Sequence, residues 1–298
     1  MTLLADPAPL DRITLRQLVQ AALEEDGANQ DLTTNALIPH EQLGRGILTA
    51  KESGVICGLN FGQETYYVVE PRVQWMAACI DGTAVAAGAT VAHVTGPMHA
   101  ILRGERVALN FLQRLSGIAT LTAEAVHAVG KSQARILDTR KTTPGLRVAE
   151  RYAVRVGGGI NHRFNLSSAL LIKDNHIAAT RARGQTLADA VQSALQAAGP
   201  ATAVEVEVTS LDELEEALEA GARAVLLDNF ELGALAAAVQ VAHARGAVTE
   251  ASGGIALEDV GAYAESGVDF ISLGAITHSA PALDISLNIV PEALEEDR

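Results

Sequence analysis

The stretch VEVEVTSLDELEEALEAGARAVLLDNF, residues 204–230, contains two apolar runs on either side of an amphipathic segment. The runs at 204–207 and 224–228 are rich in valine and leucine, which is typical of buried strands. Between them, Ser210 and Glu213 have capping-box spacing, and leucines recur at helical intervals as a buried stripe at Leu211, Leu214 and Leu218. A strand, a helix and a second strand in this order predict parallel strands joined by a helical crossover.

The same alternation extends from about residue 134 to about residue 274, with apolar runs that end in a polar residue or a glycine. An open doubly wound sheet and a closed or partly closed β/α barrel both contain this pattern. The barrel is favoured because reactive side chains follow many strands, as in barrels whose active sites lie at the carboxyl ends of the strands. The expected strand-end residues are Arg140 and Lys141, Lys173, Glu207, Asp228, Ser252 with Gly253 and Gly254, and Gly274.

These strand-end residues divide by charge. Arginine pairs with carboxylate or phosphate through two hydrogen bonds and lysine supplies a point charge, so the first two strands suit an anionic substrate. Glu207 and Asp228 offer hard oxygen ligands suited to Mg²⁺ or to ribose hydroxyls. Glycines such as Gly253 and Gly254 let backbone amides approach phosphate. Each feature alone also fits an ordinary turn or strand end, and their agreement on one face favours a site.

The net charge of the 298-residue chain is −14, which argues against nucleic-acid or anionic-membrane partners for the molecule as a whole. Residues 131–183 differ, because they hold eleven basic and three acidic residues. This basic segment is either a solvated face or a site that attracts a strongly anionic small substrate. His162 lies in it, after the glycines at 157–159, where a ligand role is favoured over a structural one.

Several other classes of protein are disfavoured by missing motifs. The glycines at 157–159 lack the spacing of a dinucleotide-binding loop, and neither a Walker motif nor a GxSxG sequence occurs. Cys57 and Cys79 lack the spacing of a zinc site or a disulfide framework. We expect a cytoplasmic protein, since neither an export signal nor a membrane-spanning run is visible.

The N-terminal part has a different pattern from the rest of the chain. Residues 14–27 read as an amphipathic helix capped by Thr14, and short strands separated by glycine turns follow from about residue 45 to 99. A second helix is expected over residues 104–129, as a bridge to the alternating part. The pattern predicts an N-terminal α+β part.

Long motifs in this chain resemble those of quinolinate phosphoribosyltransferase, and they occur in order over nearly the whole sequence. The central ones are DTRKTTPGLR at 138–147, GGGINHRFNLSSALLIKDNH at 157–176, VEVEV at 204–208, LLDNF at 226–230 and EASGGI at 250–255. The resemblance also includes DLTT at 31–34, GERVALNFLQRLSGIAT at 104–120 and SLGAITHSAPALDISL at 272–287.

The resemblance implies a fold and an assembly. The expected fold is α/β, with an open seven-stranded α/β barrel of the type II phosphoribosyltransferases at residues 116–281. An N-terminal α/β sandwich domain is expected at residues 1–115, with residues 282–298 returning to it. Family members form homodimers whose active sites are completed by the neighbouring subunit, and larger assemblies such as a hexamer of dimers.

The resemblance also implies roles for individual residues. Arg106 is expected to reach the partner's site and contact quinolinate, while Arg140, His162, Arg163 and Lys173 line the quinolinate pocket. Lys141 is expected between the two substrate sites, and Lys141, Lys173, Glu207 and Asp228 are the expected catalytic residues. Glu207 and Asp228 are expected to hold the ribosyl portion and its Mg²⁺. The other expected substrate contacts are Thr139, Ser252, Gly253, Gly254, Leu273, Gly274 and Ala275.

The implied reaction joins quinolinate to phosphoribosyl pyrophosphate (PRPP) and gives nicotinate mononucleotide, pyrophosphate and CO₂ in de novo NAD biosynthesis. Three other interpretations stay open at this point. The chain could be a paralogous transferase of the same fold, such as one that uses nicotinate. It could be a non-catalytic barrel that senses an anionic metabolite. It could also be an aldolase-like barrel with Lys173 as a Schiff-base lysine.

Overall fold

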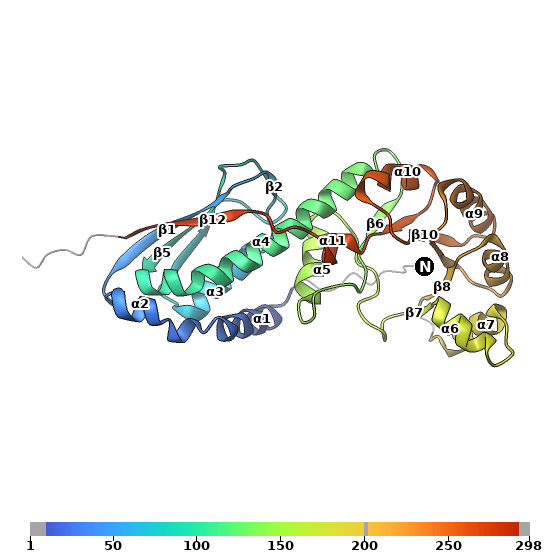
Figure 1. Cartoon of the computed structure of the whole chain (residues 1–298), viewed down its shortest axis with the longest axis horizontal. Coiled ribbons are helices and arrows are strands. Elements are labelled where there is room, and N and C mark those ends of the chain that lie inside the picture. The colour runs from blue at the N-terminus through green and yellow to red at the C-terminus, as the bar shows by residue number, and fades with distance from the viewer. Residues whose placement is uncertain (1–9, 200–201, 292–298) are drawn as a thin grey trace, which may run out of the picture. The chain divides into compact units, whose positions relative to one another are not determined.

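The computed structural model describes residues 10–199 and 202–291 (Figure 1). Contacts within the chain divide it into two compact units that interleave along the sequence. The parallel-sheet unit contains the described parts of residues 124–142 and 159–278. The N-terminal unit contains residues 10–123, 143–158 and 279–291. The domain boundaries expected after residues 115 and 281 stay predictions.

Six parallel strands form the sheet of the parallel-sheet unit, in the order β6-β11-β10-β9-β8-β7. The last strand, β11, pairs with the first, β6, which is the cyclic order of a barrel, whereas a doubly wound sheet reverses its order at an internal strand. The strands are β6 (Arg135–Leu137), β7 (Leu170–Ile172), β8 (Val204–Val208), β9 (Ala224–Asp228), β10 (Val248–Ser252) and β11 (Phe270–Ser272).

The expected α/β class is confirmed, but the described part of this sheet has six strands instead of seven. The seventh position is reduced to a single parallel bridge between Ile160 and Leu137, beside β6. The ladder does not continue there because the amide of His162 donates to the carboxylate of Asp138, at 2.7 Å, and not to a neighbouring strand. This arrangement fits an open barrel.

Helices connect the parallel strands. The Ser210 hydroxyl caps the start of α8 by accepting a hydrogen bond from the Glu213 amide, as the spacing predicted. The Glu213 carboxylate accepts from the Thr209 amide, one residue before the amide that a full capping box would use. Leu214 and Leu218 are buried as expected, whereas Leu211, expected in the same stripe, is exposed. The helices are α6 (Asp174–Arg181), α7 (Leu187–Ala197), α8 (Leu211–Glu219), α9 (Leu232–Ala244), η2 (Leu257–Asp259), α10 (Val260–Glu265) and α11 (Ala275–His278).

The N-terminal unit contains a four-stranded antiparallel sheet, in the order β12-β1-β5-β3, and a two-stranded sheet of β2 and β4. The segment expected to return from the C-terminus, 282–298, supplies β12, which pairs with β1; residues 292–298 lie outside the described residues. The strands are β1 (Leu43–Ala50), β2 (Gly54–Val55), β3 (Gln74–Ala77), β4 (Ala84–Val85), β5 (Thr90–Pro97) and β12 (Ile285–Pro291).

A hydrophobic core joins this antiparallel sheet to its helices, as Figure 1 shows for α3 and α4 beside β1 and β5. Leu48 and Val94 from the sheet and Ile101 and Leu112 from α4 are fully buried in it. The helices of this unit are α1 (Arg12–Glu25), η1 (Ala28–Gln30), α2 (Leu32–Leu37), α3 (Leu59–Val69), most of α4 (Met98–Ala128) and α5 (Arg147–Val156).

Two helix starts differ from the prediction. Helix α1 begins at Arg12, because the Asp11 carboxylate caps it by accepting from the amides of Ile13 and Thr14. Helix α4 begins at Met98 and contains Gly104 in its interior. A Cβ at Gly104 would lie 2.7 Å from the Tyr66 ring, so this glycine permits close packing and does not mark a helix end. Among the described helices, none is long and apolar enough to cross a membrane.

Candidate active site

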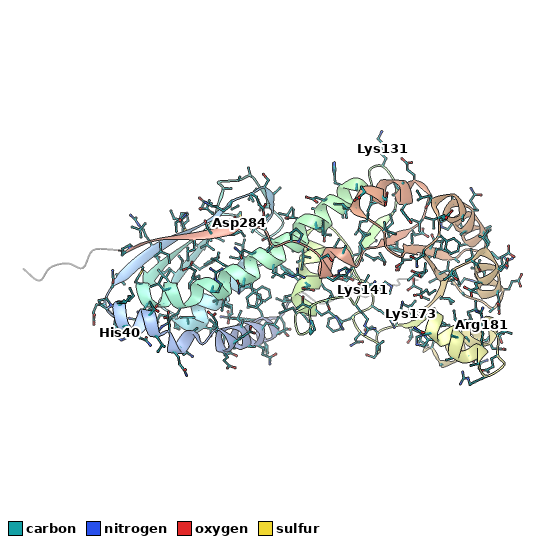
Figure 2. The ribbon with its side chains drawn as sticks, viewed as in Figure 1. His40, Lys131, Lys141, Lys173, Arg181 and Asp284 are labelled. Carbon is teal, nitrogen blue, oxygen red and sulfur yellow. The ribbon has the colours of Figure 1, made fainter. Side chains whose placement is uncertain are left out.

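A cavity of about 670 Å³ opens at the carboxyl ends of the parallel strands, and every residue that lines it belongs to the parallel-sheet unit. Lys141 and Lys173, both labelled in Figure 2, are two of these lining residues. Eleven of the fifteen site residues expected from the sequence line this cavity: Thr139, Arg140, Lys141, His162, Arg163, Lys173, Glu207, Asp228, Ser252, Gly253 and Gly254.

Four expected site residues do not line the cavity. Leu273, Gly274 and Ala275 follow β11, and Gly274 lies so close to Lys141 that a Cβ there would approach its Cδ to 3.0 Å. Arg106 lies on α4 in the N-terminal unit, where its side chain is exposed. Gly274 therefore lies next to a cavity residue, and the expected role of Arg106 stays a prediction.

Six further residues line the cavity that the sequence did not single out. Most follow from the period of two along a strand, since Glu250 precedes Ser252 by two residues and Leu226 precedes Asp228 by two. The sequence contained this alternation, but using it required knowing which residues of each strand face the cavity. The six are Leu171, Asp174, Leu226, Asn229, Glu250 and Ser272.

Lys173 and Glu207 form an ion pair within the cavity. Lys173 immediately precedes α6, and its ammonium donates to Oε2 of Glu207, on β8, at 2.5 Å. The lysine side chain is 44% exposed and the glutamate 8%. The pair therefore presents a lysine to solvent and substrate while a buried carboxylate holds it in place.

Asp228 ends β9 and lines the cavity. Burial and the negative charge of Glu207 raise the pKa of Asp228, and Lys173 opposes this shift. The next residue, Asn229, has a left-handed backbone and donates to the Asp228 carboxylate at 2.6 Å. Gly253 meets this turn closely, because a Cβ at Gly253 would lie 2.7 Å from the Asn229 backbone nitrogen. Gly253 also has a φ of +103°, which side chains rarely adopt.

Arg140, Lys141 and Arg163 are further cations that line the cavity. Burial and the neighbouring charge of Arg140 lower the pKa of Arg163, so the two guanidinium groups lie within electrostatic reach of each other. Lys141 is held by its backbone, because its amide donates to the Thr139 hydroxyl and its carbonyl accepts from Thr277. With Lys173, these residues bring four cations to a cavity that Glu207 and Asp228 also line.

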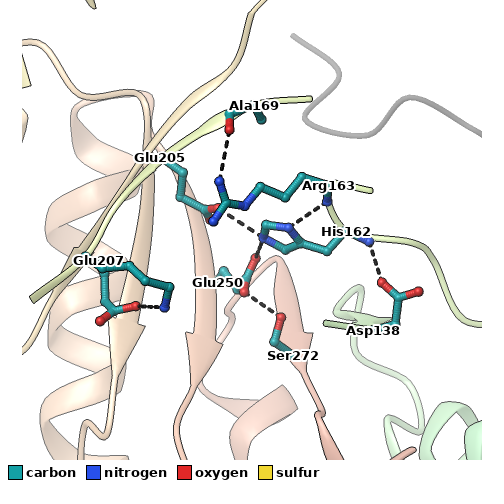
Figure 3. A network of polar contacts seen from close by, with 9 residues as sticks. Asp138, His162, Arg163, Ala169, Glu205, Glu207, Glu250 and Ser272 are labelled. Atoms are coloured by element: carbon teal, nitrogen blue, oxygen red, sulfur yellow. Dashed lines mark hydrogen bonds and ion pairs between the residues drawn. The ribbon is translucent and has the colours of Figure 1, made fainter. Parts of the chain in front are cut away.

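A buried polar network surrounds the His162 ring (Figure 3). The Nε2 atom of His162 lies 3.1 Å from Oε2 of Glu205 and 3.3 Å from Oε2 of Glu250. Glu250 also accepts from the Ser272 hydroxyl at 2.5 Å. Asp138, which is fully buried, accepts from the amide of His162 at 2.7 Å.

The network shifts the pKa of both His162 and Glu205. Burial alone would lower the pKa of His162, but the hydrogen bonds and charges of Glu205 and Glu250 raise it to about 10. Burial and the charge of Glu250 raise the pKa of Glu205. The Arg163 amide, which donates to Nδ1 of His162 at 2.7 Å, opposes protonation of that nitrogen. With Nδ1 as acceptor, Nε2 carries the hydrogen shared with the glutamates, and a ring protonated at both nitrogens would give up the contact with the Arg163 amide.

Two sets of side chains in the described residues could act as metal ligands. The first, Glu207 and Asp228, faces the cavity and consists of carboxylates, which Mg²⁺ prefers. The second is His162 with Glu205 and Glu250, whose ligand atoms lie within 4.8 Å of one another. In the second set the nitrogen and both carboxylates are already paired through a hydrogen, so the first set fits a substrate-bound Mg²⁺ better.

Comparison with known proteins gives matches over both units. The N-terminal domain of quinolinate phosphoribosyl transferase matches residues 31–116, and the C-terminal domain of that family matches residues 118–288. Together these matches cover most of the chain.

Full-length relatives give the same result. A probable nicotinate-nucleotide pyrophosphorylase (carboxylating) of Bacillus subtilis is 41% identical over 289 residues, covering 96% of this chain and 98% of the relative. The nicotinate-nucleotide pyrophosphorylase (carboxylating) of Mycobacterium leprae is 40% identical and covers 92% and 96%. A crystal structure of NadC from Streptococcus pyogenes superposes with a TM-score of 0.88 at 39% identity, covering 96% and 100%.

Proposed function

Because the chain belongs to the quinolinate phosphoribosyl transferase family, we propose that it transfers the phosphoribosyl group of PRPP to the ring nitrogen of quinolinate. The 2-carboxylate leaves as CO₂, and the other products are nicotinate mononucleotide and pyrophosphate. The reaction is a step of de novo NAD biosynthesis. The names of the relatives, carboxylating nicotinate-nucleotide pyrophosphorylases, describe the same reaction in reverse.

The observation that carries this proposal is the combination of cations and carboxylates in one cavity. Arg140, Lys141, Arg163 and Lys173 line it together with Glu207 and Asp228, and Lys173 forms an ion pair with Glu207. Quinolinate is a dianion and PRPP carries several negative charges, so their joint binding needs a concentrated positive field. The carboxylates suit the ribose hydroxyls and the positive charge that forms on the sugar.

In the first step the ring nitrogen of quinolinate forms a bond to the anomeric carbon of PRPP, while the bond from that carbon to pyrophosphate breaks. Positive charge develops on the ribose ring, where Glu207 or Asp228 stabilises it. The ammonium groups of Lys141 and Lys173 stabilise the negative charge on the leaving pyrophosphate. Both substrates are oriented before the bond forms, which removes much of the entropic barrier.

In the second step the bond between C2 and its carboxylate breaks, and CO₂ leaves. The electron pair stays on C2, next to the positively charged ring nitrogen, and a proton then adds to that carbon. The substrate acts as its own electron sink. The task of the arginines is therefore to position the carboxylates and to exclude water, without a covalent intermediate on the protein.

Mg²⁺ is part of this proposal. Glu207 and Asp228 would hold it, because both carboxylates line the cavity and the ammonium of Lys173 contacts Oε2 of Glu207. A bound Mg²⁺ would neutralise charge on the pyrophosphate group. Removal of divalent cations with a chelator should abolish turnover, and added Mg²⁺ should restore it.

We also propose a cytoplasmic homodimer with shared active sites, extendable to a hexamer of dimers. Arg106 supports sharing, because it is a cation of the family's N-terminal motif and its side chain is exposed. Arg106→Ala and Lys173→Ala should each lose most of the activity. Mixed dimers of the two should regain activity, since one of the two sites would then be complete; mixtures that stay inactive would contradict sharing.

The main test supplies the purified protein with quinolinate, PRPP and Mg²⁺, and follows nicotinate mononucleotide and CO₂. Nicotinate serves as the parallel substrate. Quinolinate-dependent release of both products is the expected result. Turnover of nicotinate alone would identify a sister transferase, and binding without turnover would identify a metabolite-binding barrel.

The Schiff-base alternative is opposed by the ion pair at Lys173. A Schiff base needs a neutral amine, and the carboxylate of Glu207 at 2.5 Å stabilises the ammonium form. Borohydride should therefore fail to trap an adduct on Lys173 in the presence of carbonyl compounds.

A further inference from the structure

We infer that Glu205 and Glu250 are positioning residues, which hold the ring of His162 and through it Arg163, so that the cavity accepts a substrate with two neighbouring carboxylates. The inference deepens the proposed function and rests on it. Neither glutamate was among the expected site residues. Figure 3 shows both carboxylates directed at the His162 ring.

Both ring nitrogens of His162 have hydrogen-bonding partners inside the protein. Nε2 faces Glu205 at 3.1 Å and Glu250 at 3.3 Å. Nδ1 accepts from the Arg163 amide at 2.7 Å. A direct hydrogen bond from this ring to a substrate would cost one of these contacts. In this geometry the ring connects the glutamates to the backbone of Arg163.

Arg163 lies in an irregular segment between the Ile160 bridge and β7. Its guanidinium donates to the carbonyl of Ala169 at 3.1 Å, and its amide is fixed by His162. The preceding amide, that of His162, is fixed by Asp138. Movement of the His162 ring would therefore displace Arg163 directly.

Arg163 and Arg140 are two cations that line the same cavity. Burial and the positive charge of Arg140 lower the pKa of Arg163. Two adjacent guanidinium groups can each bind one carboxylate of an ortho-dicarboxylate. A monocarboxylate such as nicotinate could pair with only one of the two guanidinium groups.

The burial of Glu205 and Glu250 costs free energy. Glu205 and Glu250 are each 4% exposed, and burial of two carboxylates side by side is strongly unfavourable unless they are paired. An apolar pair would serve stability equally well at such positions. Unlike an apolar pair, the two glutamates fix the His162 ring. Glu250 also accepts a hydrogen bond from Ser272 at 2.5 Å.

The experiment compares Glu205→Gln and Glu250→Gln with the wild type in steady-state kinetics and in calorimetric binding of quinolinate. Each variant should raise KM and Kd for quinolinate about tenfold, as expected for a lost hydrogen bond to a charged group. KM for PRPP should stay nearly unchanged, because Lys141, Glu207 and Asp228, to which the proposal assigns the PRPP side of the reaction, are not altered. Preference for quinolinate over nicotinate should fall.

Asp269→Asn is the matched control. Asp269 pairs with His243 at 3.0 Å at the amino end of the same sheet, far along the strands from the cavity residues. This variant should leave both KM values unchanged. If the glutamine variants do not fold, Ser272→Ala removes one hydrogen bond of Glu250 and should raise KM for quinolinate alone, by about threefold.

Unchanged quinolinate constants in the folded variants would overturn the inference. Equal shifts for quinolinate and PRPP would also overturn it, because a general structural defect affects both substrates. A wild-type protein that neither binds nor turns over quinolinate would instead refute the proposed function, and the inference with it. A failure of the inference would therefore be seen in the variants, and a failure of the proposed function in the wild-type protein.

Discussion

Two histidine–carboxylate pairs lie at opposite ends of the same parallel sheet. At the amino end, His243 on α9 contacts Asp269, which precedes β11, at 3.0 Å. At the carboxyl end, His162 contacts Glu205 at 3.1 Å and a second carboxylate, Glu250, at 3.3 Å. The distances are nearly equal, but the surroundings differ.

Exposure and charge separate the two pairs. His243 and Asp269 are 42% and 38% exposed, whereas His162 and Glu205 are 14% and 5% exposed. Burial would raise the pKa of Asp269, but hydrogen bonds from Thr249 and His243 lower it. The pKa of Glu205 is raised instead, by burial and by Glu250. The amino end is built as an ordinary stabilising contact, and the carboxyl end holds a costly charged cluster beside a cavity.

The largest expected effect separates lysines at the two ends. Lys173→Ala should lower kcat by about 100-fold, because it removes a cation that stabilises the leaving group and leaves the buried Glu207 without its partner. Lys131→Ala, which removes an exposed lysine outside the cavity, should leave kcat unchanged. Steady-state kinetics of both variants provide the test. Similar rates for the two would remove the functional contrast between the ends.

The next effect compares two glycines that flank β10. Gly253→Ala should raise KM for PRPP about tenfold and destabilise the protein by about 2 kcal/mol, since the new Cβ would meet Asn229 in a left-handed backbone. Gly246, at the other end of the strand, has a φ of +69° and nothing within 4 Å of the added Cβ.

Gly246→Ala should therefore cost about 1 kcal/mol from backbone strain alone and leave KM unchanged. Urea denaturation and initial-rate kinetics measure both quantities. A normal KM for PRPP in the Gly253→Ala variant would show that this turn does not take part in phosphate binding.

The smallest effect is an opposite pH dependence of the two pairs. The pKa of His162 is raised from 6.5 to about 10, so its stabilising contribution is full below pH 6.5 and is lost as pH rises toward 10. The pKa of Asp269 is lowered from 3.8, so its contribution is present above that value and is lost as pH falls through the lowered one.

Free energies of unfolding of wild type, His162→Gln and Asp269→Asn, measured from pH 3 to pH 10, test this contrast. The difference in free energy of unfolding between wild type and His162→Gln should become smaller as pH rises. The corresponding difference between wild type and Asp269→Asn should become smaller as pH falls. Parallel profiles would show that the two pairs do not differ as described.

Much of this site followed from the sequence, because strand ends in a parallel α/β fold meet on one side of the sheet. Lys173, Glu207 and Asp228 were found in this way, each at the end of an apolar run. The paired glutamates were not, since the alternation VEVEV puts Glu205 on the same face as Glu207 but does not show that both lie inside the sheet. Burial of a carboxylate depends on partners from distant segments, here the loop that carries His162.

The strand count failed for a similar reason. The segment around Ile160 is short, and its next amide is taken by the side chain of Asp138. Competition of a side chain with the backbone ladder is set by tertiary structure. The start of α4 was missed because Gly104 reads locally as a helix boundary, whereas its actual role is contact with Tyr66.

The central claim is that the carboxyl end of the sheet binds an ortho-dicarboxylate and promotes its decarboxylating transfer. The most direct measurement offers wild-type protein equal amounts of quinolinate and nicotinate with PRPP and Mg²⁺, with the quinolinate labelled in its 2-carboxylate. The account predicts one labelled CO₂ for each nicotinate mononucleotide formed. Mononucleotide formed without labelled CO₂ would contradict it.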